Sequence, residues 1–321
     1  MRTRILLFLI PMLAVAAYRL HHTSPSDRDA AALIDRSFAP SWSSNEQWIS
    51  SMEERVRRDP DDVKAAAMLG QAYLQRVRES GDPANYKKAD VLFERALKKD
   101  PKSIDAMLGK ATLLMARHQF AQARDFARTA IEIEPDVVAT YGVLTDALVE
   151  LGEIDEAIEV LGTMVRRKPN LSSYSRVSYI RELKGDVPGA IEAMTMAVES
   201  GAPTAENTAW CMVHLGNLYL HQEQLDRAEA QYRRALRQFP EYGHAFGGLA
   251  KVAAAKQDFA AAAEHYRRAI DRVPLSEFAL GLGTAYQELG MMEESLVQFN
   301  LARSLEERHR DYGVAAEGAR K

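Results

Sequence analysis

The sequence predicts an all-α fold, an α-solenoid of about seven stacked helix–turn–helix units. Three observations predict it. A pattern of small and apolar residues recurs with steps of 34, 34, 33, 38, 34 and 33 residues. Within each unit the apolar residues follow helical spacing, and prolines close most units. The composition, 47% hydrophobic and 27% charged with 18 Gly and 12 Pro, is that of a folded helical chain.

Residues 1–17 form a separate apolar segment. Arg2 and Arg4 precede residues 5–17, which carry no charge. This run is short for a bilayer-spanning helix, which needs about 20 residues. It suits the apolar core of a secretory signal, and residues 14–16 offer small side chains for cleavage. An uncleaved N-terminal membrane anchor extending through Leu20 and an ordinary buried helix remain alternatives. No Cys follows the run, which excludes a lipoprotein anchor.

With either a signal peptide or an anchor, the remaining chain is expected to be exported through a membrane into a periplasmic or extracellular compartment. The protein is then either secreted or N-terminally anchored. Residues 18–44 are polar and irregular and are expected to form a tether. Residues 45–61 are expected to form a capping helix that starts at Ser44 or Asn45 and stops at Pro60. Trp48 and Met52 lie one turn apart and are expected to cover the first repeat.

The repeat occupies residues 62–305, in units of about 62–101, 102–135, 136–169, 170–202, 203–240, 241–274 and 275–305. A small residue in each second helix falls at Ala89, Ala123, Ala157, Ala190, Ala228, Ala262 and Ser295. Another position lies seven residues later, at Ala96, Ala130, Met164, Ala197, Ala235, Ala269 and Ala302. Prolines close five units, at Pro101, Pro135, Pro169, Pro240 and Pro274.

The first helices of three units carry Leu-Gly-x2-Tyr, beginning at Leu69, Leu215 and Leu282. Together with Ala-x3-aromatic and the closing proline, this pattern resembles the tetratricopeptide repeat. The resemblance covers about three quarters of the chain. Ala111, Thr145 and Ser178 replace the glycine in the second, third and fourth units, and the family's usual Trp is absent. In the fifth unit that position is Met212, and Trp210 is expected on a different face.

The resemblance implies a right-handed superhelix whose first helices line a concave groove. Such a groove typically holds an extended peptide or a helix of a protein partner. Carried over by position, its lining would be Lys64, Ala67, Gln71, Asp105, Thr112, Asp146, Arg176, Tyr179, Trp210, Val213, His214, Asn217, His244 and Lys251. Some family members hold a C-terminal carboxylate with Lys and Asn side chains. Only Asn217 matches that set, with Lys251 nearby, so this clamp is expected to be absent.

The sequence argues against several other functions. A net charge of −4 gives no electrostatic case for nucleic acid. Cys211 stands alone, which excludes an internal disulfide framework and favours a small buried side chain. No nucleotide loop, nucleophile elbow or zinc-protease motif is present, so neither an enzyme nor a cofactor is expected. His214, Asn217 and His221 share a helical stripe, for which metal binding, pH-sensitive ligand contact and simple groove polarity remain open.

Two insertions interrupt the period. Residues around Glu79–Tyr86 are expected to lengthen the turn of the first unit into a surface loop. Residues 199–207 form either a hinge between four and three units or a longer first helix in the fifth unit. Residues 306–321 are strongly polar, which predicts a solvent-facing end and argues against end-to-end stacking.

Two functions are compatible with these features, and the oligomeric state is open under both. The first is a non-enzymatic exported scaffold that binds a protein partner in its groove. The alternative is a structural assembly protein of an envelope or membrane complex, built by self-association of repeats.

Overall fold

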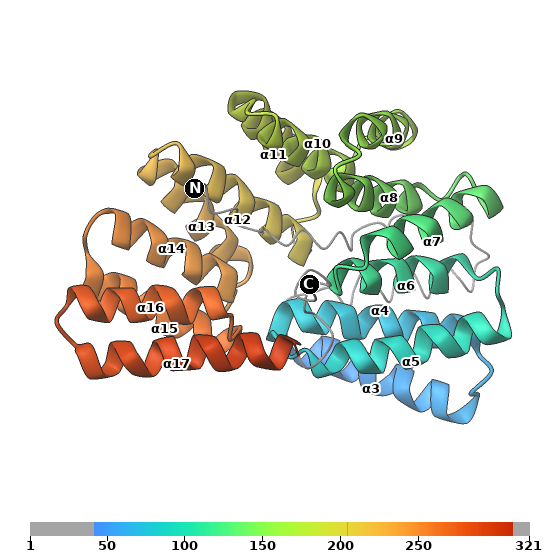
Figure 1. Cartoon of the computed structure of the whole chain (residues 1–321), viewed down its shortest axis with the longest axis horizontal. Coiled ribbons are helices and arrows are strands. Elements are labelled where there is room, and N and C mark those ends of the chain that lie inside the picture. Colours follow the sequence, from blue (N-terminus) through green and yellow to red (C-terminus); the bar gives the residue numbers. More distant parts are fainter. Residues whose placement is uncertain (1–41, 204, 311–321) are drawn as a thin grey trace, which may run out of the picture.

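The computed structural model describes residues 42–203 and 205–310, and every regular element in this part is a helix. The predictions for residues 1–17 and 18–41 lie outside the described residues. Figure 1 shows the helices as antiparallel pairs arranged around a closed curve. The fifteen helices of the described part are α3 (Trp42–Arg58), α4 (Val63–Ser80), α5 (Ala84–Lys99), α6 (Ile104–Ala116), α7 (Phe120–Ile133), α8 (Val138–Leu151), α9 (Ile154–Arg167), α10 (Leu171–Leu183), α11 (Val187–Ser200), α12 (Glu206–His221), α13 (Leu225–Gln238), α14 (Gly243–Ala255), α15 (Phe259–Arg272), α16 (Ser276–Glu288) and α17 (Met292–His309).

The all-α solenoid is confirmed, with seven helix pairs from α4–α5 to α16–α17 and the single helix α3 packed before them. The helix α3 begins at Trp42, before the predicted Ser44 or Asn45, and Trp48 and Met52 pack against the core of the first pair. Local signals set several helix starts. Asp62 caps α4 by accepting from the Ala65 amide, and Asn170 begins α10 with a capping box.

Aromatic side chains of the second helices hold neighbouring units together, each against glycines of two first helices. A Cβ on Gly70 or Gly109 would lie 2.6 or 2.2 Å from the Phe93 ring. The Tyr232 ring is enclosed in the same way by Gly216, at 2.5 Å, and Gly248, at 2.4 Å. Since real Cβ atoms do not approach so closely, these glycines create the space that the rings fill.

Both insertions lengthen first helices. The helix α4 has 18 residues, whereas α6, α10, α14 and α16 have 13. It continues to Ser80, and the residues that follow are buried, among them Gly81, Pro83, Asn85 and Tyr86. The predicted surface loop is therefore wrong. The other insertion gives α12 16 residues, as the longer-helix alternative predicted.

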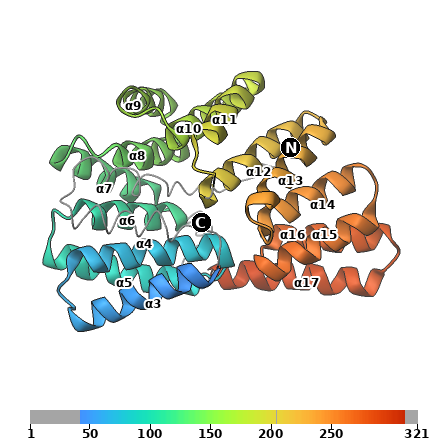
Figure 2. The same cartoon turned by 180° about the vertical axis from the view of Figure 1, so that it is seen from behind.

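The two lengthened helices meet, and the array closes on itself there. Figures 1 and 2 both show the end of α17 beside the start of the array. We call this contact the closure. It joins residues 75–82 to Glu206, His244, Pro274, Arg308 and His309, and Tyr242 takes part through its hydrogen bond to Glu206. The Arg308 guanidinium donates to Asp82 at 3.5 Å, and the His309 ring lies 3.4 Å from the Gly81 carbonyl oxygen.

Glu206 is the centre of the closure. Its carboxylate accepts from Arg78 at 2.9 Å, from the Tyr242 hydroxyl at 2.7 Å and from Gln75 at 3.3 Å. Burial by itself raises the pKa of Glu206, but the Arg78 charge and the hydrogen bonds from Tyr242 and Gln75 outweigh burial and leave the pKa lowered. The carboxylate therefore stays ionised at neutral pH and binds the first unit to the fifth and sixth.

We expect Glu206→Ala to lower the free energy of unfolding by about 2 kcal/mol, because a largely buried Arg78 loses its charged partner. Hydrogen exchange should rise in residues 75–82 and at the end of α17, while α8 and α9 on the far side keep their protection. Equal exchange in the variant and the wild type at residues 75–82 would contradict closure through Glu206.

Candidate functional site

Three of the predicted groove residues of α12, namely Trp210, His214 and Asn217, lie along one partly exposed stripe. The Trp210 and His214 rings stack with centroids 3.7 Å apart. Asn217 accepts from the buried Tyr232 hydroxyl at 2.7 Å through its side-chain oxygen, which leaves its amide nitrogen as a donor. Met212 is fully buried where the family usually has Trp, and Trp210 is partly exposed on another face, as expected. The stripe therefore offers an aromatic stack beside an oriented amide.

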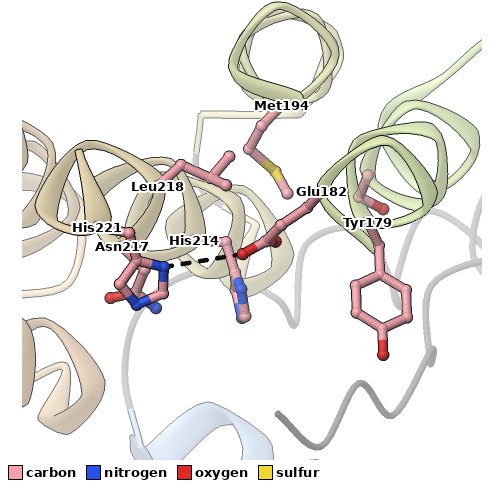
Figure 3. A pocket seen from close by; sticks show the side chains of 8 residues that line it. Tyr179, Glu182, Met194, His214, Asn217, Leu218 and His221 are labelled. Carbon is pink, nitrogen blue, oxygen red and sulfur yellow. Dashed lines mark ion pairs between the residues drawn. The ribbon is translucent and has the colours of Figure 1, made fainter. Parts of the chain in front are cut away.

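A small cleft lies beside this stripe, between α10, α11 and α12. Its lining comprises Ser175, Tyr179, Glu182, Met194, His214, Asn217, Leu218 and His221. We call it the α10–α12 cleft. Figure 3 shows the Tyr179 and His214 rings projecting to the same side. Met194 and Leu218 form its apolar floor and are almost completely buried, and polar groups surround them.

Polar side chains face each other across the cleft. The His221 ring nitrogen lies 3.8 Å from the Glu182 carboxylate, the contact drawn as the dashed line in Figure 3. Burial and the neighbouring carboxylates of Glu150, Asp146 and Glu182 raise the pKa of Tyr179 to about 12, so its hydroxyl stays a donor. The cleft thus combines hydrogen-bond donors and acceptors with an apolar surface.

His214 is neutral in the folded protein. Burial, helped by His244 and Lys251, lowers its pKa to about 3. An unfolded His has a pKa near 6.5 and takes up a proton as the pH falls below that value. His214 in the folded state does not take up this proton until the pH approaches 3. The stability that His214 contributes above pH ~6.5 is therefore lost as the pH falls toward 3.

We therefore expect the His214 contribution to the free energy of unfolding to fall between pH 7 and pH 5, and His214→Gln to remove that contribution. The measurement is urea unfolding by circular dichroism at both pH values. His221→Gln is the control, because that side chain lies in the same cleft and is 51% exposed. An unchanged pH dependence in His214→Gln would contradict a His214 ring that stays neutral in the folded protein.

Five predicted groove residues lie inside the stack. Thr112 is 3% exposed and donates to the Leu108 carbonyl at 2.8 Å within its own helix. Asp146 and Arg176, both 6% exposed, form an ion pair between α8 and α10 at 2.8 Å. Ala67 and Val213 are buried as well. These side chains contribute to packing rather than to a surface that a partner could contact, because tight stacking of the first helices covers them.

The other predicted groove residues are spread along the inner helices. Gln71 of α4 donates to the backbone oxygen of Asp105 in α6 at 3.2 Å, which connects neighbouring units. Lys251 forms an ion pair with Glu277 at 3.1 Å. His244 belongs to the closure, where its ring lies 3.3 Å from the Arg78 carbonyl oxygen. Lys64 is exposed at the start of α4. Only Tyr179, His214 and Asn217 are brought together in the cleft.

Sequence reasoning missed the cleft residues Ser175, Glu182, Met194 and Leu218. Met194 is a buried residue of α11, and Leu218 lies next to Asn217 on the packing side of α12. A signal was present in the alignment of units, because an acidic residue, Glu182, and a histidine, His221, lie at the ends of the first helices of consecutive units.

No group of three or more His, Cys, Asp or Glu side chains within residues 42–203 and 205–310 is arranged to hold a metal ion. His214 and His221 therefore lack the further ligands that a site would need in this part of the chain. Cys211 is buried and burial raises the pKa of its thiol, so it behaves as the small apolar residue that was expected.

Within the described helices, none combines the length and the apolar character required to cross a bilayer.

Comparison with protein families decides which repeat this is. Tetratricopeptide repeat models match residues 82–141 and 114–178, 174–241, and 214–277 and 249–303. The chain belongs to the tetratricopeptide repeat family. The matches follow one another along most of the helix pairs, which confirms the resemblance seen in the repeat positions. Comparison with curated protein sequences gives no match.

Solved structures with the same architecture include three tetratricopeptide repeat solenoids. The Cut9–Hcn1 hetero-tetramer of the APC/C has a TM-score of 0.64 at 14% identity, over 90% of this chain and 56% of that one. IFIT1, as a monomeric mutant with a capped RNA, has a TM-score of 0.61 at 14% identity, over 84% and 67%. TTC0263 of Thermus thermophilus has a TM-score of 0.52 at 25% identity, over 61% and 99%.

The likeness to Cut9 and IFIT1 shows the fold alone, and this chain spans little more than half the length of the Cut9 chain. Tetratricopeptide repeat folds are typically protein-interaction scaffolds without catalytic activity.

Proposed function

We propose that this protein is an exported, non-catalytic scaffold that binds an extended segment of a protein partner across α12 and the α10–α12 cleft. The observation that carries the proposal is the stripe of Trp210, His214 and Asn217 beside the apolar surface of Met194 and Leu218. Partly exposed aromatic residues next to fixed polar groups are the usual composition of a binding hot spot.

The chemistry of the stripe suits a peptide backbone with an apolar side chain. The Asn217 amide nitrogen donates to a peptide carbonyl, and its oxygen is already held by Tyr232. An apolar side chain of the peptide lies over the mouth of the cleft, beside the partly exposed Tyr179 and His214 rings, and Trp210 covers the adjoining segment. Because the stacked helices fix these groups beforehand, binding loses mainly the conformational entropy of the peptide.

Export is proposed from residues 1–17, whose paired arginines and uncharged run suit a signal peptide or anchor. Cell fractionation and the intact mass of the recovered chain test it. A chain outside the cytoplasm that begins near residue 17, or a full-length chain in the membrane fraction, supports export. A full-length chain in the cytoplasm alone excludes it.

The binding test is affinity capture with the full chain beside its Trp210→Ala and Asn217→Ala variants. Captured proteins are identified by mass spectrometry, and circular dichroism checks that the helices persist. Loss of a hot-spot aromatic should weaken the affinity by about thirtyfold, equivalent to roughly 2 kcal/mol. Val91→Ala is the matched control, because Val91 is 58% exposed on the second helix of the first unit.

A partner that is lost with Trp210→Ala and kept with Val91→Ala supports the proposed surface. A partner that is kept by Trp210→Ala as well as by Val91→Ala must bind to another surface of the protein. Binding of a capped RNA by the wild-type chain, sensitive to Trp210→Ala, would replace the protein partner with nucleic acid, against the net charge of −4.

A further inference from the structure

The α16–α17 pair carries a concentration of uncovered apolar side chains. Ten large hydrophobic residues are exposed in the described part of the chain, and six belong to this last pair and its turn. They are Leu280, Leu289, Met291, Met292, Leu296 and Val297, from 37% to 62% exposed. We call them the terminal patch. From this patch we propose that two copies of the chain associate through their α16–α17 pairs, with the two α17 helices antiparallel.

The repeat itself shows that this surface is shaped to receive helices. Leu296 occupies the position that Ala263 holds one unit earlier, where the following unit leaves only 6% exposed. Leu280 occupies the position of Gly247, where a Cβ would lie 2.3 Å from the Phe278 ring of the next unit. In an internal unit the side chains at both positions are covered by the helices of the next unit. In the last unit no described helix follows α17, so Leu280 and Leu296 stay exposed. Figures 1 and 2 show α17 along the edge of the molecule.

The opposite end of the array does not complement this patch. The exposed side chains of α3 are all polar in the part described, namely Glu46, Gln47, Ser50, Ser51, Arg55, Arg57 and Arg58. An apolar patch against this polar helix would bury charges without partners. Head-to-tail stacking is therefore disfavoured, and the remaining arrangement in which copies cover each other's patch is a two-fold one.

The charges of α17 favour the antiparallel arrangement. Its first turn is acidic, with Glu293 and Glu294, and Arg303 follows on the exposed side. None of the three has an ion-pair partner among the described residues. In an antiparallel pair centred near Gln298, Arg303 of each copy comes to the acidic first turn of the other. Residues 306–308 at the end of α17 are exposed, as the predicted solvent-facing end requires, and residues 311–321 lie outside the described residues. That prediction did not consider the apolar first half of α17.

Sedimentation velocity of the full chain tests the proposal. The wild type should sediment as a dimer at micromolar concentration, and Leu296→Glu should sediment as a monomer with unchanged helicity. Val91→Glu is the matched control, since Val91 holds the repeat position of Val297 in the first unit and is equally exposed. It should leave the dimer intact.

Charge reversal tests the orientation. Arg303→Glu alone should raise the dimer dissociation constant about tenfold, and adding Glu293→Arg with Glu294→Arg should restore it. A monomeric wild type would overturn the proposal. It would do so even if Leu296→Glu abolished the binding of some other cellular protein to the patch. A dimer that survives Leu296→Glu would overturn it as well, and failure of the triple variant to restore association would overturn the antiparallel arrangement.

Discussion

Arg176→Ala is expected to lower the free energy of unfolding by about 3–5 kcal/mol, because it leaves the Asp146 carboxylate buried without its partner. The guanidinium donates to both Asp146 oxygens at 2.8–3.1 Å, and also to the Ser172 backbone oxygen at 2.8 Å. Gly142 leaves room for it, since a Cβ there would lie 2.9 Å from the guanidinium carbon. Urea unfolding followed by circular dichroism measures the loss.

The destabilisation by Arg176→Ala is expected to depend on pH through the Asp146 carboxyl. Burial raises the pKa of Asp146 to about 6, even though Arg176 acts in the opposite direction. A carboxyl whose folded pKa is raised contributes stability below its unfolded pKa, near 3.9, and loses it as the pH rises through the folded value. Without Arg176 the pKa rises further, so Arg176→Ala should regain stability as the pH falls from 7 toward 5.

The control replaces both partners. Asp146→Leu with Arg176→Met should cost less than Arg176→Ala, because no buried charge remains unpaired. A loss below about 1 kcal/mol in Arg176→Ala would show that water reaches Asp146 and that the pair does not join α8 to α10.

Tyr232→Ala is expected to cost about 3–5 kcal/mol, the usual effect of removing a large buried aromatic ring. The ring is fully buried between the glycines of two neighbouring units, so its loss leaves a cavity at the interface of the fifth and sixth units. It also removes the hydrogen bond that orients Asn217. The measurement is unfolding by urea, together with the affinity of the captured partner.

Tyr232→Phe separates these two effects. It keeps the ring and should cost only about 1 kcal/mol, the value of one hydrogen bond. Gly248→Ala should be destabilising in the wild type, where its Cβ meets the ring, and better tolerated in Tyr232→Ala. Equal costs of Gly248→Ala in both backgrounds would contradict the packing of Tyr232 against Gly248.

Most of the fold could be predicted from the repeat positions alone. Ala89, Ala123 and their equivalents are fully buried, because each allows two helices to approach closely. The glycines at 70, 216 and 283 face the aromatic rings of their own units. These features are local, so they are visible within a single unit of sequence.

The closure and the burial of groove residues could not be predicted in this way. Both depend on small rotations between units that accumulate over the whole array. The two insertions were recognised, but neither contained a sign that Arg78 of one and Glu206 of the other would meet 2.9 Å apart. Asp146 and Arg176 occupy groove positions by alignment, but the curvature of this array turns them toward each other.

The most direct test of the account is photo-crosslinking from inside and outside the array in the cells that make the full chain. A photoreactive phenylalanine analogue replaces His221, which is half-exposed at the cleft, and in a second strain replaces Val91 on an outer helix. If the cleft binds a protein, position 221 should give one defined covalent adduct and position 91 none. Adducts from position 91 with none from position 221 would contradict it.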